Sequence, residues 1–112
     1  MRIARYMFCL CFFIASGCGN EREVNIGGDE SSIGAQVFID GKLKGVMEEK
    51  IYKGDYPGIP KNAKYACADI RVPYNTFSLV VKKNGESIEK EIGYSYEMYI
   101  YVEFSKRKIN GP

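Results

Sequence analysis

Two neighbouring glutamates and one cysteine are the residues of this chain that best fit acid–base or covalent chemistry. Glu89 and Glu91 would share one face of a strand about 7 Å apart, a separation that glycoside hydrolases use. Cys67 offers a thiol nucleophile, but the chain contains no histidine to act as its base. We therefore predict no catalytic residue. The glutamates fit a solvated edge strand, and Cys67 fits a small buried residue beside neighbouring alanines.

Metal, cofactor and nucleic-acid chemistry have no recognisable motif. The sequence has no Cys/His cluster, no glycine-rich phosphate loop and no calcium-loop spacing, so neither a metal nor a cofactor is predicted. The chain holds 16 Lys and Arg against 14 Asp and Glu, and Arg2 and Arg5 lie in the N-terminal segment, which leaves 14 of each sign elsewhere. Without a net positive field, nucleic acid is not an expected partner.

The first 17 residues have the order of a secretory signal. Arg2 and Arg5 supply a positive start, residues 6–14 form an unbroken apolar run, and small residues follow at 15–17. A membrane-spanning helix needs about 20 apolar residues, and this run is shorter. Residues 1–17 are therefore predicted to be a signal peptide.

The segment Ala15-Ser16-Gly17-Cys18 resembles the lipobox of bacterial lipoproteins, in which small residues precede a cysteine that receives a diacylglyceryl thioether. The resemblance implies a lipoprotein whose mature N-terminus is lipidated Cys18, tied to a membrane by its acyl chains. Gly19 follows, where retained inner-membrane lipoproteins tend to carry Asp. This favours the outer membrane, on its periplasmic face or at the cell surface. The alternative is an ordinary secreted protein cleaved near Ala15 or Gly17, in which Cys18 stays a thiol or forms a disulfide.

The remaining sequence divides into a tether, one domain and a tail. Residues 18–33 are polar and contain several glycines and serines, which predicts a flexible tether after the lipidated cysteine. Residues 34–105 alternate apolar and polar side chains in short runs, which predicts an all-β domain, a small antiparallel β-sandwich of about six to seven strands. Residues 106–112 are predicted to form a basic, frayed tail. Cys67 is then the one cysteine left in the domain and has no disulfide partner.

Six alternating runs carry the strand prediction, at residues 36–40, 42–46, 64–72, 76–82, 87–92 and 97–104. The dipeptides Asp40-Gly41 and Asn84-Gly85 favour the positive φ angles of tight hairpin turns. The high charge of residues 87–92 suits an edge strand. Residues 52–63 contain two glycines and two prolines and are predicted to be an irregular loop.

Four of the nine tyrosines lie near the last predicted strand, namely Tyr94, Tyr96, Tyr99 and Tyr101. Alternation places Tyr99 and Tyr101 opposite the apolar residues at 98, 100, 102 and 104. A tyrosine combines an apolar ring with a polar tip, which makes it common on binding surfaces. These four tyrosines are the candidate partner surface. The alternative is that this face is covered by the other sheet or by the loop around Pro57.

Residues 35–42, Gly45, residues 70–73 and residues 77–85 together resemble a PEGA-type domain. Such domains are small β-sandwiches of bacterial envelope proteins that open on a hairpin of the form V-x-I-D-G, here Val37 to Gly41. The similarity spans most of residues 35–104. It implies a fold and an envelope setting, and it brings no catalytic residues.

The sequence therefore predicts a non-enzymatic, lipid-anchored binding or structural module of the bacterial cell envelope. Its expected partners are the membrane, through the anchor, and an envelope protein or glycan. A second hypothesis is an inhibitor or immunity-type lipoprotein of the periplasm that inserts residues 52–61 into the cleft of an enzyme. A small envelope hydrolase is a third, and the missing histidine weighs against it.

Overall fold

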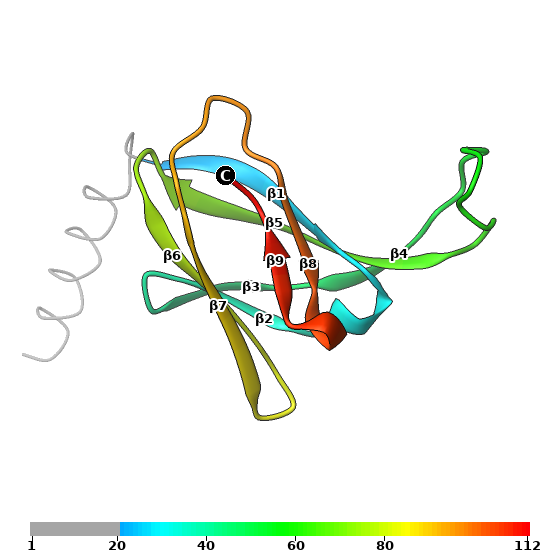
Figure 1. Cartoon of the computed structure of the whole chain (residues 1–112), viewed down its shortest axis with the longest axis horizontal. Helices are drawn as coiled ribbons and strands as arrows, with labels where there is room; N and C mark the ends of the chain where they lie inside the picture. The colour runs from blue at the N-terminus through cyan, green and yellow to red at the C-terminus, as the bar shows by residue number, and fades with distance from the viewer. Residues whose placement is uncertain (1–20) are drawn as a thin grey trace, which may run out of the picture.

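A computed structural model describes residues 21–112, which form two β-sheets packed face to face with irregular connections (Figure 1). Strands make up 57% of the described residues and helix only 7%. The predicted all-β sandwich is confirmed. It has about nine strands, more than the six to seven expected from sequence.

Sheet A contains, in spatial order, β4 (Glu48–Ile51), β5 (Lys64–Pro73), β1 (Glu21–Gly28), β8 (Ile100–Glu103) and β9 (Lys108–Asn110). Sheet B contains, in spatial order, β3 (Lys42–Val46), β2 (Gln36–Ile39), β6 (Phe77–Lys83) and β7 (Glu86–Ile92). Neighbouring strands are antiparallel except β1 and β8, which are parallel. Two short 3₁₀ turns, η1 (Glu30–Ser32) and η2 (Phe104–Lys106), complete the elements.

The core lies between the two sheets and is built from the inward positions of each alternating strand. In β5 these are the positions predicted, Ala66, Ala68, Ile70 and Val72, and all four are buried. Sheet B contributes, from β2, β6 and β7, the buried side chains Val37, Ile39, Phe77, Leu79, Val81, Ile88 and Ile92. The period of two that identified these strands therefore sets the core.

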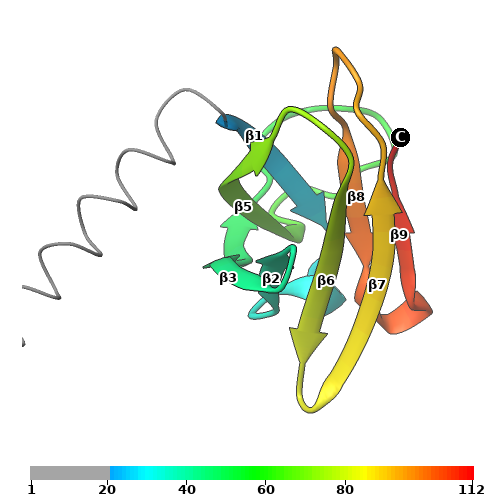
Figure 2. The same cartoon turned by 90° about the vertical axis from the view of Figure 1, so that its left-hand side faces the viewer.

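Both predicted hairpin turns are present. Asp40 and Gly41 have φ angles of 50° and 84°, and Asn84 and Gly85 have 53° and 80°. Two successive positive φ angles give the turn whose twist matches paired strands. The second hairpin joins β6 to β7, and β7 is an edge strand of sheet B, as its charge predicted (Figure 2).

The flexible tether predicted for residues 18–33 is wrong over the described part of that range. Residues 21–28 form β1, which lies between β5 and β8 in sheet A. β1 pairs with β5 along its whole length, from Glu21 opposite Pro73 to Gly28 opposite Ala66. Its inward side chains Val24 and Ile26 are buried, so the two sheets hold this segment by pairing and by packing.

The C-terminal prediction also needs correction. Residues 108–110 are not frayed, because they form β9, which pairs with β8 and buries Ile109. The strand expected at 97–104 is shorter, since β8 covers only Ile100–Glu103. Residues 93–99 form an irregular loop between β7 and β8 that runs beside the start of β1.

An arm made of β4, the loop 52–63 and the first two residues of β5 leaves the sandwich. β1 ends at Gly28, opposite Ala66, so the paired residues 50–51 and 64–65 and the loop between them extend past the end of β1. All four residues of β4 are exposed, which is why no apolar pattern marked this strand in the sequence. In Figure 1 the arm projects at the right, at the opposite end of the molecule from the start of β1.

Candidate functional site

The glutamate pair lies on an exposed edge strand. Glu89 and Glu91 are both solvent-exposed in β7, and Glu89 accepts a long hydrogen bond of 3.5 Å from the Ser78 hydroxyl. A hollow of about 390 Å³ lies at the nearby hairpin and is lined mainly by residues 82–87. Neither glutamate lines it. The pair therefore occupies the solvated edge that the sequence predicted, away from a cleft that would desolvate an acid.

Cys67 lies on the outer face of sheet A and is half-buried, not buried beside the alanines as expected. Ala66 and Ala68 point into the core, so alternation turns the thiol outward. The Asn25 side chain donates to the Cys67 sulfur at 2.8 Å and to the Asp69 carboxylate at 2.8 Å. Cys67 also lines a hollow of about 220 Å³ beside β3.

The four candidate tyrosines divide into two environments. Tyr94, Tyr96 and Tyr99 lie in the loop 93–99 with 54%, 88% and 68% of their surface exposed. Tyr101 lies in β8, where its ring packs beside Gly27 of β1 on the outer face of sheet A. The sequence placed Tyr101 opposite Ile100 and Val102, and both of these side chains are buried as expected.

The loop 93–99 is fastened to β1 by one arginine. Arg22 donates from Nη2 to the Ser95 carbonyl at 2.6 Å and from Nη1 to the Tyr96 carbonyl at 3.3 Å. Its guanidinium carbon lies 5.3 Å from the ring centre of Tyr94 and 5.6 Å from that of Tyr74, so the cation is flanked by aromatic rings. We call these five residues, Arg22, Tyr74, Tyr94, Ser95 and Tyr96, the Arg22 cluster.

The Arg22 cluster was not predicted from sequence. Arg22 precedes its backbone partners by 73 and 74 residues and falls in the segment expected to be a tether. Its Nε atom is buried without a hydrogen-bond partner among residues 21–112. The tyrosines were a usable signal for an exposed surface, but no local pattern linked them to Arg22.

Tyr101 is the residue of this region whose titration is shifted. Burial against sheet A raises the pKa of the Tyr101 phenol, and the carboxylates of Asp29 and Glu103 raise the pKa further. A raised pKa keeps the phenol neutral, which gives no activated base or nucleophile at neutral pH.

The arm carries a second exposed surface. At its tip Tyr56 is 69% exposed and Ile59 is 43% exposed. The loop is held by its own contacts: Tyr52 exchanges backbone hydrogen bonds with Ala63 and Asn62, and its hydroxyl accepts from the backbone N–H of Tyr56 at 2.9 Å. Apolar side chains are therefore presented to solvent on a loop with defined internal contacts.

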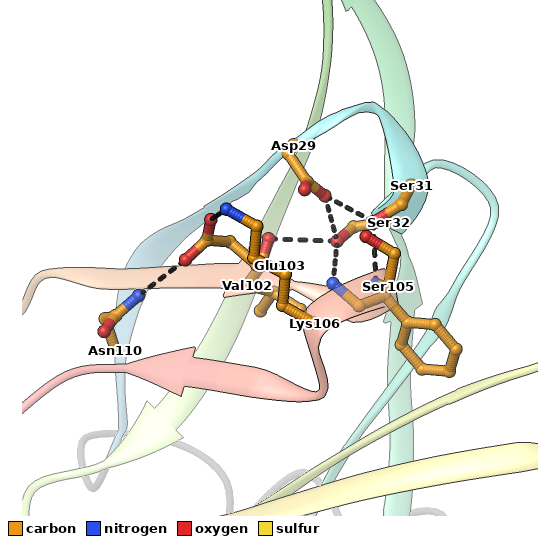
Figure 3. A network of polar contacts seen from close by, with 9 residues as sticks. Asp29, Ser31, Ser32, Val102, Glu103, Ser105, Lys106 and Asn110 are labelled. Atoms are coloured by element: carbon orange, nitrogen blue, oxygen red, sulfur yellow. Dashed lines mark hydrogen bonds and ion pairs between the residues drawn. The ribbon is translucent and has the colours of Figure 1, made fainter.

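A network of polar contacts, which we call the polar latch, joins η1 to β8 and η2 next to the end of β1 (Figure 3). Ser32, the buried polar residue of the core, accepts from the backbone N–H of Phe104 at 3.2 Å. Its hydroxyl lies within donating distance of the Val102 carbonyl at 3.0 Å and of the Asp29 carboxylate at 3.2 Å. The Ser31 hydroxyl also donates to the Asp29 carboxylate at 2.6 Å and accepts from the backbone N–H of Ser105 in η2 at 2.9 Å. The latch ties η1 to η2 and its contacts are internal, so we assign it to stability.

No protein family, curated protein or solved structure matches this chain. The lipobox and PEGA resemblances therefore stay predictions, and Cys18 lies outside the described residues. Within residues 21–112 no three metal-binding side chains of the His, Cys, Asp or Glu type are grouped as a site. The helices of that part of the chain are too short to cross a membrane.

Proposed function

We propose that this chain is a non-enzymatic, lipid-anchored module of the bacterial cell envelope that holds a protein or glycan partner at the membrane surface. Cys18 carries the lipid, and the outer membrane is the favoured location. The arm is the element that contacts the partner. Anchor and arm together make the chain a short spacer between a bilayer and a bound molecule.

The observation that supports this proposal is the position of the arm relative to the start of β1. β5 runs from the arm to Pro73, which lies opposite Glu21, and its 10 residues cover about 33 Å at roughly 3.3 Å per residue. The arm and the start of β1 therefore lie at opposite ends of the long dimension of sheet A (Figure 1). A lipid attached three residues before Glu21 leaves the tip at the end away from the membrane.

The chemistry of the tip fits a protein partner well. Tyr56 and Ile59 expose apolar surface, and aromatic side chains are enriched at the centre of protein interfaces. The only ion pair within the loop, among the described residues, joins Lys61 to Asp55 at 3.8 Å, and both side chains are exposed to water. The other ion pair of the arm, Lys64 with Glu49 at 4.0 Å, is also exposed to water. Exposed pairs contribute little, so we assign recognition to the apolar side chains of the tip.

The alternative that the structure favours specifically is inhibition of an enzyme. A loop that protrudes, exposes apolar side chains and keeps its conformation through internal hydrogen bonds is suited to enter a cleft with little loss of entropy. The proposals differ in one property. An inhibitor abolishes the activity of its partner at one-to-one stoichiometry, whereas a spacer leaves that activity intact.

The anchor is tested by metabolic labelling with an alkyne fatty acid. The full-length chain should take up the label, and the Cys18→Ala variant should not. An unlabelled wild-type chain contradicts the lipoprotein hypothesis.

The arm is tested with a photo-crosslinking amino acid placed at Tyr56 in the full-length chain. Glu91, which is exposed on the edge of sheet B, is the matched control position. A discrete adduct from position 56 and none from position 91 supports the arm as the binding element. Equal adducts from both positions, or an adduct from position 91 alone, contradict it. Purified adduct partners are then assayed for activity, which separates the spacer from the inhibitor.

A further inference from the structure

We infer that the end of the sandwich formed by the Arg22 cluster and the loop 93–99 rests on the lipid bilayer, with its tyrosines in the headgroup region. This inference rests on the proposed lipid anchor at Cys18. It goes beyond the anchor because it assigns a face of the folded domain to the membrane. It also fixes the orientation of the arm.

The covalent chain sets the geometry. Only Gly19 and Asn20 separate Cys18 from Glu21, so the Cα atoms of Cys18 and Glu21 lie at most about 11 Å apart even if the chain is fully extended. A lipidated Cys18 therefore holds the start of β1 close to the bilayer. Whatever surrounds the start of β1 must lie at the membrane surface as well.

Two segments surround the start of β1. One is the loop 93–99, which is bound through Arg22. The other is the β5–β6 turn, where Pro73 pairs with Glu21 and the ring of Tyr74 lies against the Arg22 guanidinium. Figure 2 shows the start of β1, the β5–β6 turn and the loop between β7 and β8 together at the top of the molecule. Three tyrosines of the candidate partner surface, Tyr94, Tyr96 and Tyr99, thus lie on a loop that an anchored chain brings to its membrane. The fourth, Tyr101, is paired with Gly27 and lies toward the other end of β1.

The chemistry of this end fits a lipid surface. Tyr94, Tyr96, Tyr99 and Tyr74 are all at least half exposed, and tyrosine is enriched at membrane–water interfaces because its ring and hydroxyl match the two sides of the boundary. Arg22 keeps the loop in place while its charge is shared with aromatic rings and carbonyls. The tyrosines are thereby held in position before they meet the bilayer.

Charge adds little to the contact. The charged side chains of the start of β1, of its ion-pair partners and of the loop 93–99 balance, three of each sign. They are Glu21, Glu23, Glu97, Arg22, Lys44 and Arg71. Glu21 already pairs with Lys44 at 3.4 Å and with Arg71 at 3.6 Å. These six side chains form no polybasic cluster to attract anionic lipid, so the contact depends on the tyrosine rings.

The chain contains no tryptophan, so a single substitution introduces a unique fluorescent probe. Tyr96→Trp reports the proposed membrane face, Tyr99→Trp repeats the measurement at a second position of the loop, and Tyr56→Trp is the matched control at the tip of the arm. All three positions are exposed, so the fold tolerates the larger ring. Each full-length lipidated variant is reconstituted in vesicles of phosphatidylethanolamine and phosphatidylglycerol, with and without brominated acyl chains.

The expected result is that brominated lipid quenches the fluorescence of Tyr96→Trp and Tyr99→Trp several-fold more than that of Tyr56→Trp. Soluble acrylamide should quench in the reverse order, and added salt should change neither pattern. Vesicle flotation is measured on the same samples. Variants that float, yet show equal quenching by brominated lipid at all three positions or stronger quenching at position 56, overturn the orientation while the anchor stands. Variants that do not float refute both the anchor and this inference.

Discussion

Ser32→Ala is the most informative single change for the stability of the sandwich, because it removes one buried hydroxyl and leaves the backbone in place. Ser32 is completely buried, and its hydroxyl accepts from the Phe104 N–H. Val102 keeps a partner in the variant, since its carbonyl also accepts from the backbone N–H of Asp29 at 3.0 Å. Asp29 likewise keeps its bond from Ser31 at 2.6 Å. The group that loses its partner is therefore the Phe104 N–H.

The magnitude follows from that single loss. A buried donor left without a partner is destabilising by about 1–3 kcal/mol, so we expect Ser32→Ala to lower the free energy of unfolding by about 2 kcal/mol. Ser31→Ala is the matched control. Its hydroxyl accepts the backbone N–H of Ser105, an exposed contact that water can replace. It also donates to the Asp29 carboxylate, which keeps its bond from Ser32 in the Ser31→Ala variant. We expect Ser31→Ala to lower the free energy of unfolding by less than about 0.5 kcal/mol.

Urea unfolding of residues 19–112 measures both variants. With a slope of about 1–2 kcal/mol per molar, the Ser32→Ala midpoint should fall by about 1–2 M and the slope should not change. A Ser32→Ala variant that unfolds within the error of the wild type would contradict this prediction. So would a Ser31→Ala variant that is equally destabilised, because burial would then not distinguish the two serines.

Two further predictions concern sheet A. A Cβ atom added at Gly28 would lie 2.9 Å from the Ser32 Cβ, 2.9 Å from the Val102 carbonyl and 3.0 Å from Met47, so Gly28→Ala should be destabilising by about 1–3 kcal/mol. A thermal melt that matches the wild type would contradict this. The raised pKa of Tyr101 means that the neutral phenol is favoured in the folded state. The stabilisation that the Tyr101 phenol contributes to the free energy of unfolding is therefore complete below the unfolded pKa of about 10. It is lost as the pH rises through the folded pKa. As the pH rises above about 10, the urea midpoint of Tyr101→Phe should fall less than that of the wild type. Midpoints that fall equally in both proteins would argue against the raised pKa.

The strands of sheet B could be predicted from sequence because their information is local. β6 and β7 alternate clearly, and the Asn84-Gly85 turn sets their register without help from distant residues. Sheet A was less predictable. β1 has only Val24 and Ile26 as inward apolar side chains, and its third inward position is Gly28, which must be small because Ser32 and Met47 crowd it. A strand that ends in two glycines is hard to distinguish from a linker.

The candidate site shows the same division. Tyr94, Tyr96 and Tyr99 are exposed, as a partner surface requires. The prediction put Tyr99 on the outer face of a strand at 97–104, whereas it lies in the loop before β8. Their link to Arg22 was not visible, since the contact joins residues more than 70 positions apart. The arm was foreseen as a loop, but β4 was missed because pairing with β5, and not burial, holds it.

The central position of β1 has a consequence for how the chain folds. The hairpins β2–β3 and β6–β7 join neighbouring segments, and such hairpins form in about 1–10 μs. β1 instead pairs with β5 and with β8, which lie much later in the chain, and Ile26 is opposite Ile100. Contacts of such long range slow folding, so the pairing of β1 sets the rate and the two hairpins of sheet B should form first. A chain shortened before Ile100 would leave one edge of β1 bare, which favours pairing between molecules over completion of the fold.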